Sequence, residues 1–453
     1  MSSLRPTPTP ALVVPDEQTW TMADRDPADL GADVTYSIAR ARRVLVADDL
    51  PPQLAEPLAQ LRAVADPGNG GHVHDTHGED TPEHAAHGHG DGDDAHHHDA
   101  DGQDQSAHEH GEGHDMMAIV GEPSADGLVM EPIELRYGPL ATPLPGGLAA
   151  DVTLDGDVVA EARVEALLRA EPSADGRPAS PDALAAAAWG EAMRRADAAP
   201  AAAGAPAAAR WVRVAGIELE RAINHLAWLR AFMRLLGWAE VVASVTAALI
   251  PLRVARRSLP GGPDRHTPGA VEAASDLEAA GEAIGALARR LDGSRALRLR
   301  TGGLGAVRAA DAAERNLAGP IARACGVTDD ARADDPLYRL LGFEPVVRQE
   351  GDALARALLR VDEAEQSAQL AHAALNRVAN GDATAAQLRS PTATVEGPRG
   401  PLRARRRADG WDLDARGADA ARSLAGELMV GEEWAAALVA LASLDLSPWV
   451  VGR

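Results

Sequence analysis

The sequence predicts a mainly α protein with a small antiparallel β part, an α+β fold. The strongest helical pattern runs from Arg210 to Gly237, where apolar residues recur at spacings of three and four. Two β-prone runs around Asp155-Gly156-Asp157 are typical of a hairpin. Much of the apolar content is alanine, and only two Phe and three Tyr are present, so close helix packing is expected to form the core.

The first 115 residues contribute little to the predicted fold. Within residues 1–65, one strand is expected at Arg43–Asp48 and one helix at Pro52–Ala65, as a small accessory segment without assigned chemistry. Residues 66–115 are of low complexity and rich in His and Asp. Because such a segment buries too little apolar surface to offset its ordering entropy, a disordered linker is expected there. The main domain is expected at residues 116–453.

Twelve of the fifteen histidines lie in this linker. Imidazoles beside carboxylates bind Ni²⁺, Zn²⁺, Cu²⁺ or Co²⁺. One interpretation is that the tract stores or delivers a metal, above all nickel or zinc. The other is that it is a solvated linker that binds metal only incidentally. A flexible tract imposes no geometry that would select one metal, which favours the second interpretation. The candidate metal ligands are His96, His97, His98, His108, His110 and His114.

Ordered structure is expected to return near Met116. The prolines between Gly138 and Gly147 predict an irregular loop ahead of the hairpin. Between residues 170 and 209, which are rich in Pro, Ala and Gly, one short helix is expected at Pro181–Ala196.

The helix at 210–237 also carries a polar face. Glu218, Arg221 and His225 stand at offsets of zero, three and seven, so they line up beside the apolar stripe. One interpretation is a solvated face or an internally satisfied ion pair, since buried histidines are usually hydrogen-bonded structural residues. The other interpretation is that the helix presents His225 to a redox centre or ligand in a partner protein.

Several helices are expected after this one. The polar-faced helix is expected to continue through Ala255 with a bend before Pro251, ahead of a Gly/Pro-rich loop at 256–267. The stretch TGGLG at 301–305 predicts a turn, because it lacks the glycine fingerprint of a phosphate-binding loop. A terminal hairpin is expected within 395–411. The remaining helices are expected at Asp276–Asp292, Asp311–Cys325, Gly351–Arg377, Ala418–Met429 and Glu432–Leu444.

Charge and cysteine content exclude several classes of function. The net charge of −24 argues against binding to nucleic acid, which needs clustered cations. The single cysteine, Cys325, rules out a disulfide within the chain and a Cys-rich zinc or iron–sulfur site made by this chain alone. No signal-peptide pattern opens the sequence, and no apolar run reaches the roughly 20 residues of a membrane span. The chain is expected in the cytoplasm, attached to a membrane only through partners.

Four segments of the chain carry a family resemblance. They are YGPLATPLPGGLAADVTLDGDVV, RVAGIELERAINHLAWL, the region at 319–375 with Gly319-Pro320, Asp334-Asp335-Pro336, Gly351-Asp352, Arg360, Glu363 and Gln366-Ser367, and VEGPRGPL with LVALASLDLSPW. In this order they resemble the D-subunit family of respiratory NADH:quinone oxidoreductase (complex I), which shares its fold with the large subunit of nickel–iron hydrogenases. The resemblance covers residues 128–453 and implies a long-helix bundle core.

The resemblance implies a quinone site in altered form. The D-subunit proteins hold the quinone head group with a loop histidine and a tyrosine. Here the loop from Gly138 to Gly147 has no histidine, and residues 170–210 have no tyrosine. A modified quinone site, with Gly138 and Pro139 among its residues, is the expectation that remains.

The resemblance also excludes hydrogenase chemistry. Hydrogenase large subunits hold nickel and iron with two CxxC pairs. The positions that match one pair are Ser447 and Val450, and the region that matches the other, Ala188–Gly190, has no Cys. A hydroxyl and an alkyl group cannot replace bridging thiolates.

A third implication concerns the helix histidine. In the D-subunit proteins this histidine lies beside the terminal iron–sulfur cluster of a small partner protein and couples it to protons. The resemblance thus assigns His225 to a partner's cluster, with Arg221 and Glu218 in support, while an ordinary ion pair between the last two is an equal alternative.

Two functions remain open. The first is a component of an NADH:quinone oxidoreductase-like complex at the inner face of the cell membrane, which docks a small iron–sulfur subunit and other complex I-like subunits. Such a chain contributes to a modified quinone site while its own catalytic residues are degenerate. The second is a non-catalytic scaffold or maturation factor that binds nickel or zinc through its His-rich tract.

Overall fold

The computed structural model describes ten stretches of the chain, and the helix expected at Pro52–Ala65 and the linker expected at 66–115 lie outside them. Strand β2 (Arg43–Leu45) pairs in parallel with β1 (Ala11–Val13) and falls within the strand predicted at Arg43–Asp48. The described residues are 11–13, 43–45, 132–139, 141, 143–169, 185–197, 207–259, 269–381, 392–408 and 410–451.

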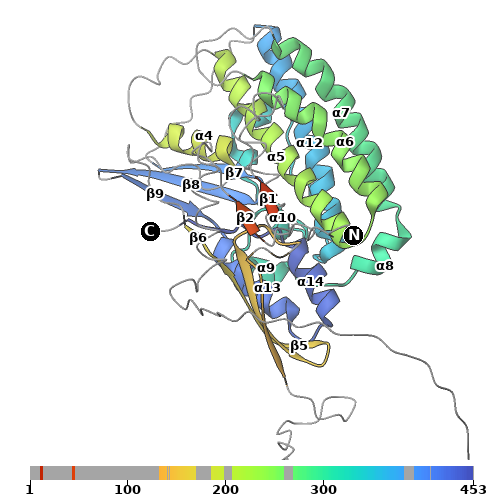
Figure 1. The fold of residues 1–453 in the computed structure, drawn as a ribbon. Coiled ribbons are helices and arrows are strands. Elements are labelled where there is room, and N and C mark those ends of the chain that lie inside the picture. Colours follow the sequence, from red (N-terminus) through yellow and green to blue (C-terminus); the bar gives the residue numbers. More distant parts are fainter. Residues whose placement is uncertain are drawn as a thin grey trace, which may run out of the picture. The chain divides into compact units, whose positions relative to one another are not determined.

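Four long helices form a bundle around the main apolar core. They are α5 (Ala207–Leu235), α6 (Ala239–Ser258), α7 (Gly269–Asp292) and α12 (Ala353–Ala379). Helix α5 packs against α6 and α12, and α7 packs against the same two, so the four helices close a ring (Figure 1). The predicted apolar stripe of α5 is buried in full, from Ala215 to Leu236. The mainly α prediction with its long-helix bundle is therefore confirmed.

The predicted continuation of α5 through Ala255 is wrong. Gly237 adopts a positive φ of 75°, and the Trp238 N–H donates to the carbonyl of Met233 at 2.9 Å. This left-handed residue, which glycine adopts without a Cβ penalty, closes α5 before α6 begins. Pro251 lies inside α6, which continues to Ser258.

The helix predicted at Asp311–Cys325 is also interrupted. Asn316 and Gly319 have positive φ, of 53° and 63°, and they separate α9 (Ala309–Glu314) from α10 (Gly319–Arg323). The stretch predicted as a turn, TGGLG, forms a turn at the end of α8. The other helices are α4 (Ala186–Ala196), α8 (Arg295–Thr301), the 3₁₀ helix η2 (Ala331–Asp334), α11 (Pro336–Leu340), α13 (Ala418–Met429) and α14 (Trp434–Ser443).

Two small antiparallel sheets complete the fold. In the first, β4 (Leu148–Asp155) pairs with β5 (Val158–Ala166) across the predicted Asp-Gly turn, and β3 (Ile133–Tyr137) lies along the other edge of β4. The predicted terminal hairpin is part of a three-stranded sheet of β7, β8 and β9. The bounds are Thr392–Gly397, Gly400–Arg407 and Gly410–Ala415, and a short parallel pair joins β6 (Leu168–Arg169) to β10 (Trp449–Val450).

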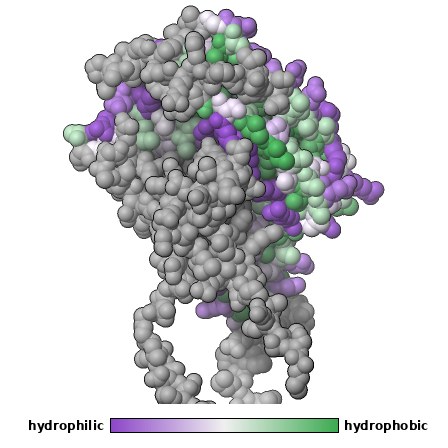
Figure 2. All heavy atoms as spheres, turned by 45° about the horizontal axis from the view of Figure 1, so that its top comes forward, coloured by the Kyte–Doolittle hydropathy of each residue, from purple (hydrophilic) through white to green (hydrophobic). Residues whose placement is uncertain are grey.

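Separate apolar clusters fix these sheets. Helices α13 and α14 cover β5, and α4 packs on β7 and β8. On the visible face of the bundle, apolar side chains are interspersed with polar ones (Figure 2). Among the described helices, none combines the length and the apolar content of a membrane-spanning helix.

Candidate functional site

The polar face of α5 is buried. Glu218, Arg221 and His225 have no exposed surface, so the interpretation of a solvated face is wrong. Glu218 and Arg221 do form an internal ion pair, with Arg221 Nε 3.3 Å from Glu218 Oε2. Buried charges need such partners, because an uncompensated charge inside a protein costs several kcal/mol.

Helix α12 presents a matching polar stripe to α5. Arg360, Glu363 and Ser367 follow at spacings of three and four, and each is at most 1% exposed. Ser367 Oγ donates to Glu218 Oε2 at 2.7 Å. Glu363 Oε2 lies 2.9 Å from His225 Nε2, and Arg360 Nη1 lies 3.1 Å from His225 Nδ1. The two polar stripes therefore face each other across the bundle.

His225 is held as a neutral imidazole. A guanidinium only donates, so Nδ1 must accept from Arg360, and the ring hydrogen is on Nε2, facing Glu363. Burial, together with the nearby charges of Arg360 and Arg221, lowers the pKa of His225 to about 4 against the opposing effect of Glu363. Both ring nitrogens thus face side chains of this chain.

Arg323 of α10 joins this pair to the β7 strand. Its Nε donates to Glu363 Oε1 at 2.6 Å and its Nη1 to Glu396 Oε1 at 2.8 Å, while Asp330 lies 3.1 Å from Nη1. Burial alone would raise the pKa of Glu363, but Arg323 and His225 hold it well below its usual range. Burial and Asp330 raise the pKa of Glu396.

Glu218 is the second centre of charge. Tyr338 Oη donates to it at 2.6 Å, and Arg332 Nη1 donates at 3.1 Å. Burial opposes its ionisation, yet Arg221 and Arg332 lower the pKa of Glu218. We call the connected set the buried ionic network. Its members are Glu218, Arg221, His225, Arg323, Asp330, Arg332, Tyr338, Arg360, Glu363, Ser367 and Glu396.

The network fixes the turn between β7 and β8. Arg221 donates to the carbonyls of Gly397 and Glu396, at 2.7 and 2.6 Å. On the other side, Gly319 packs so closely that an added Cβ would lie 2.4 Å from the carbonyl oxygen of Arg399. The backbone that carries Arg399 is therefore held from α5 and from the start of α10.

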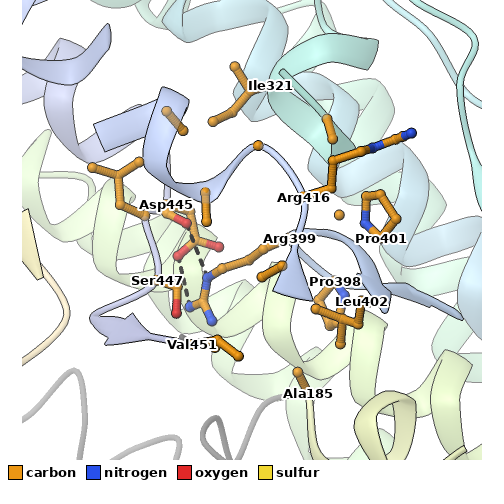
Figure 3. Close-up of a pocket in the computed structure, with 18 of the residues that line it drawn as sticks. Ala185, Ile321, Pro398, Arg399, Pro401, Leu402, Arg416, Asp445, Ser447 and Val451 are labelled. Atoms are coloured by element: carbon orange, nitrogen blue, oxygen red, sulfur yellow. Dashed lines mark hydrogen bonds and ion pairs between the residues drawn. The ribbon is translucent and has the colours of Figure 1, made fainter. Parts of the chain in front are cut away.

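This turn forms one wall of a pocket. Arg399 Nη2 donates to Asp445 Oδ1 at 3.0 Å and Arg399 Nε to the Asp445 carbonyl at 3.1 Å (Figure 3). Ser447 and Trp189 line the same pocket, whose cavity volume is about 60 Å³. Arg360 lines it too and reaches Asp445 Oδ2 at 3.1 Å. Arg360 thus connects the pocket directly to His225.

The structure brings the two hydrogenase-related segments together at this pocket. Trp189, from the segment Ala188–Gly190, and Ser447 both line it. The only cysteine, Cys325, is buried elsewhere, its thiol donates to the Ile321 carbonyl at 3.1 Å, and burial raises its pKa to about 11. A thiolate-held nickel–iron centre does not fit these side chains.

The expected quinone residues Gly138 and Pro139 lie apart from this pocket. They follow β3, and Gly138 packs against the backbone of Leu148. Neither residue lines the pocket of Arg399 and Asp445.

The expected metal ligands of the His-rich tract lie outside the described residues. Within the described residues, no group of three His, Cys, Asp or Glu side chains could hold a metal ion.

Most of the network was not predicted from the sequence. In the sequence, Arg360, Glu363 and Ser367 are identified only as residues that carry the family resemblance. Their helical spacing nevertheless matches that of the polar face on α5. That repeated spacing could have identified α12 as the partner helix. Arg399 and Asp445 carry no local signal, since their pairing joins residues 46 positions apart.

Comparison with known proteins finds relatives for part of the chain. Residues 240–405 match the family model described as the 49-kDa subunit of respiratory-chain NADH dehydrogenase. The NADH-quinone oxidoreductase D-subunit 2 of Sinorhizobium medicae is 40% identical over 95 residues, which cover 20% of this chain and 24% of the relative. The D-subunit of Salinibacter ruber is 31% identical over 188 residues, 38% of this chain and 42% of the relative. The matched stretches therefore span less than half of these relatives.

The fold also resembles that of solved structures. A chain of the membrane-bound sulfane sulfur reductase, an archaeal respiratory membrane complex, superposes with a TM-score of 0.56 at 22% identity and covers 70% of this chain and 97% of its own.

Residues 240–405 therefore resemble the D-subunit family in sequence, and the fold resembles that of a chain from a respiratory membrane complex.

Proposed function

We propose that this chain is the D-subunit-like component of a membrane-associated redox complex related to NADH:quinone oxidoreductase. In such a complex it docks a small iron–sulfur subunit at the inner face of the membrane and receives electrons from that partner. The names of the relatives, which are components of NADH-quinone oxidoreductases, support the redox assignment.

The observation that carries the proposal is the convergence at one pocket. The turn of Pro398 and Arg399, the segment of Asp445–Ser447 and the α4 residue Trp189 line it together. Three parts of the chain that lie far apart in sequence thus enclose one small space, and a buried ionic network fixes its wall. Pockets with mostly apolar walls and a few fixed polar groups are the usual place for a small ligand. We assign the electron acceptor to this pocket, in place of the loop at Gly138 and Pro139.

In this function the residues of the buried ionic network hold other groups in position and do not themselves react. Arg221 and Arg323 hold β7 from two sides, and Arg360 links the neutral His225 to Asp445 at the pocket. Electrons reach the acceptor from the partner's cluster, and this chain supplies the binding groups. The proposal therefore needs a partner that carries the cluster.

Assembly is the decisive experiment. The full chain, tagged at its C-terminus and expressed from its own genome, should copurify with a small iron–sulfur subunit whose cluster gives a reduced-state EPR signal. NADH or another donor should then reduce an added short-chain quinone in the purified complex. Recovery of the chain without any cluster-bearing protein would contradict the proposal.

Composition supports a second candidate function. The twelve histidines within residues 66–115 stand among carboxylates, a set of ligands suited to Ni²⁺ or Zn²⁺. A scaffold or maturation factor would use this tract and would leave the pocket without redox chemistry. The two functions differ in whether an iron–sulfur partner is found.

A further inference from the structure

We propose that the outer edge of strand β3 binds the same strand of a second copy of this chain. The two strands pair antiparallel about a two-fold axis at Leu135, and the two three-stranded sheets join into one. The inference goes beyond the proposed function and does not depend on it, because no residue of β3 lines the pocket of Arg399 and Asp445.

Strand β3 has one open edge. Its inner edge pairs with β4 along all five residues. Within the part of the chain that the structure describes, no strand pairs with the other edge. On the far side of the sheet, β5 is covered by α13 and by a bridge from Val158 to Glu433. The open edge of β3 is therefore the one that offers unpaired backbone groups to another strand.

The open edge is ordered and partly apolar. Ile133 is 54% exposed, although it lies in a strand. Tyr137, at the other end of β3, packs edge-on against Trp434 with 5.2 Å between the ring centroids, which holds the strand against the body of the chain. The strand contains no Pro, and the irregularity in this sheet lies between β4 and β5. Its two charged residues are thus the main features that decide what can pair with it.

These charges complement each other in one register. When two copies pair about Leu135, Glu134 of each copy stands opposite Arg136 of the other, and Ile133 stands opposite Tyr137. Opposite charges in facing positions stabilise a strand pair, and so does an aliphatic residue that faces an aromatic one. Each pair occurs twice, because the two-fold axis repeats it.

The neighbouring registers are disfavoured. If the joined sheet keeps the same face outward in both copies, the axis can move only from Leu135 to Glu134 or to Arg136. The first shift sets two glutamates opposite each other, and the second sets two arginines opposite each other. Like charges in facing positions destabilise the pair. Charge therefore selects the register centred on Leu135.

The sheet already offers a place for an acidic residue beyond β3. Arg136 lies opposite Asp151 on β4, which in turn lies opposite Arg163 on β5. Arg136 donates to Asp151 at 2.7 Å and to Glu165 at 2.5 Å, yet its side chain is still 44% exposed. Because charges alternate along this row, the next position favours a carboxylate. Glu134 of the second copy supplies it, and Glu134 has no ion-pair partner among the described residues.

The other three-stranded sheet does not share this property. Its strand β9 also has an edge without a strand partner in the described part of the chain. Pairing two copies of β9 about Leu413 sets Asp412 of each opposite Asp414 of the other, so like charges face each other. Of these two edges, charge favours self-pairing at β3.

The test measures the mass of the full chain by sedimentation equilibrium. Five residues on each side make a small interface, so a dissociation constant on the order of 10–100 µM is expected. The average mass should rise from that of one chain toward that of two as the concentration increases through this range. EDTA is present throughout, because His-rich tracts can bridge chains through a metal ion.

Charge reversal tests the register. Glu134→Arg and Arg136→Glu each turn two favourable pairs into like-charge pairs, so each variant should dimerise at least about tenfold more weakly than wild type. An equimolar mixture should recover dimerisation, because each arginine then meets a glutamate of the other chain, and this recovery excludes a folding defect. Glu161→Arg is the matched control, since Glu161 is exposed on the same face but lies on β5, and it should dimerise like wild type.

A cysteine at the axis tests the geometry. Leu135→Cys sets two thiols opposite each other, with about 5 Å between their Cβ atoms, and oxidation with diamide should join the two chains. The native thiol of Cys325 is buried and does not compete. Glu161→Cys, away from the open edge, should remain unlinked.

Three results overturn the proposal. They are a wild-type chain that stays monomeric, a Glu134→Arg chain that dimerises as tightly as wild type, and a mixture of the two variants that stays monomeric. Crosslinking of Leu135→Cys to a different protein in place of a second copy also overturns it, because the edge then belongs to another partner. None of these results touches the copurification of an iron–sulfur subunit, which tests the proposed function.

Discussion

The free energy of unfolding should fall in mild acid, because His225 is buried as a neutral imidazole. The imidazole is fully buried between Arg360 and Glu363, and burial lowers its pKa to about 4, against an ordinary value near 6.5. Between these two values the unfolded chain binds a proton that the folded chain does not. The free energy of unfolding must therefore fall as the pH falls through this window.

The size of the effect follows from the two pKa values. From pH 7 to pH 5, the linkage relation gives a loss of about 2 kcal/mol in the free energy of unfolding. The depressed pKa values of Glu363 and Glu218 act in the same direction, but only as the pH falls below about 4.5, where their unfolded forms begin to bind protons. Glu396, whose pKa burial raises, acts in the opposite direction, so the difference between wild type and His225→Gln, and not the wild-type slope alone, reports the histidine.

The measurement is urea unfolding of the full chain at half-unit steps between pH 7 and pH 5, followed by tryptophan fluorescence. His225→Gln should be less stable at pH 7 and should show little slope in this window. His372→Gln removes a half-buried histidine of α12, bonded to Asn376, and should keep the wild-type slope. A wild-type chain whose stability is constant over this range, or a His225→Gln slope equal to that of wild type, would refute the assignment of a buried neutral imidazole.

Three further outcomes are expected. Gly319→Ala should lower the free energy of unfolding by at least about 1 kcal/mol more than Gly381→Ala, because both have positive φ but only the first would meet backbone, and paired urea melts measure the difference. Tyr338→Phe should cost about 2 kcal/mol, since its hydroxyl donates to buried Glu218 at 2.6 Å; no loss in the same melts would contradict that bond's importance. Deleting residues 72–114 should abolish tight Ni²⁺ binding in calorimetry and spare the fold, and stoichiometric metal in the deleted chain would contradict the metal role.

Local patterns predicted the elements of this fold well where one face is buried. The apolar spacing on α5 and the Asp-Gly turn between β4 and β5 both lie where the sequence places them. The misplaced boundaries, at Gly237 and between α9 and α10, come from residues with positive φ that end a helix without breaking its apolar spacing. Periodicity does not detect such ends, because the next helix resumes the same pattern.

The site could be predicted only in part, for a different reason. Spacing grouped Glu218, Arg221 and His225 correctly, but it could not tell burial from exposure, since a polar stripe looks the same in both cases. Their partners are set by tertiary contacts: Arg221 reaches a strand 176 positions away. The polar stripe of α12 could have identified these partners, because two polar stripes in one helix bundle can pair with each other and so avoid leaving buried charges alone.

The buried ionic network is better explained by its role in positioning the turn between β7 and β8 than by a contribution to the stability of the fold. A buried ion pair is weak support for stability, because apolar residues of similar volume are often as good or better. What apolar residues cannot do is donate to the carbonyls of Gly397 and Glu396, as Arg221 does, and so fix the turn that carries Arg399. In a core dominated by leucine and alanine, apolar contacts alone define such a turn poorly. The charges inside this bundle therefore set the place of one partly exposed guanidinium at the pocket.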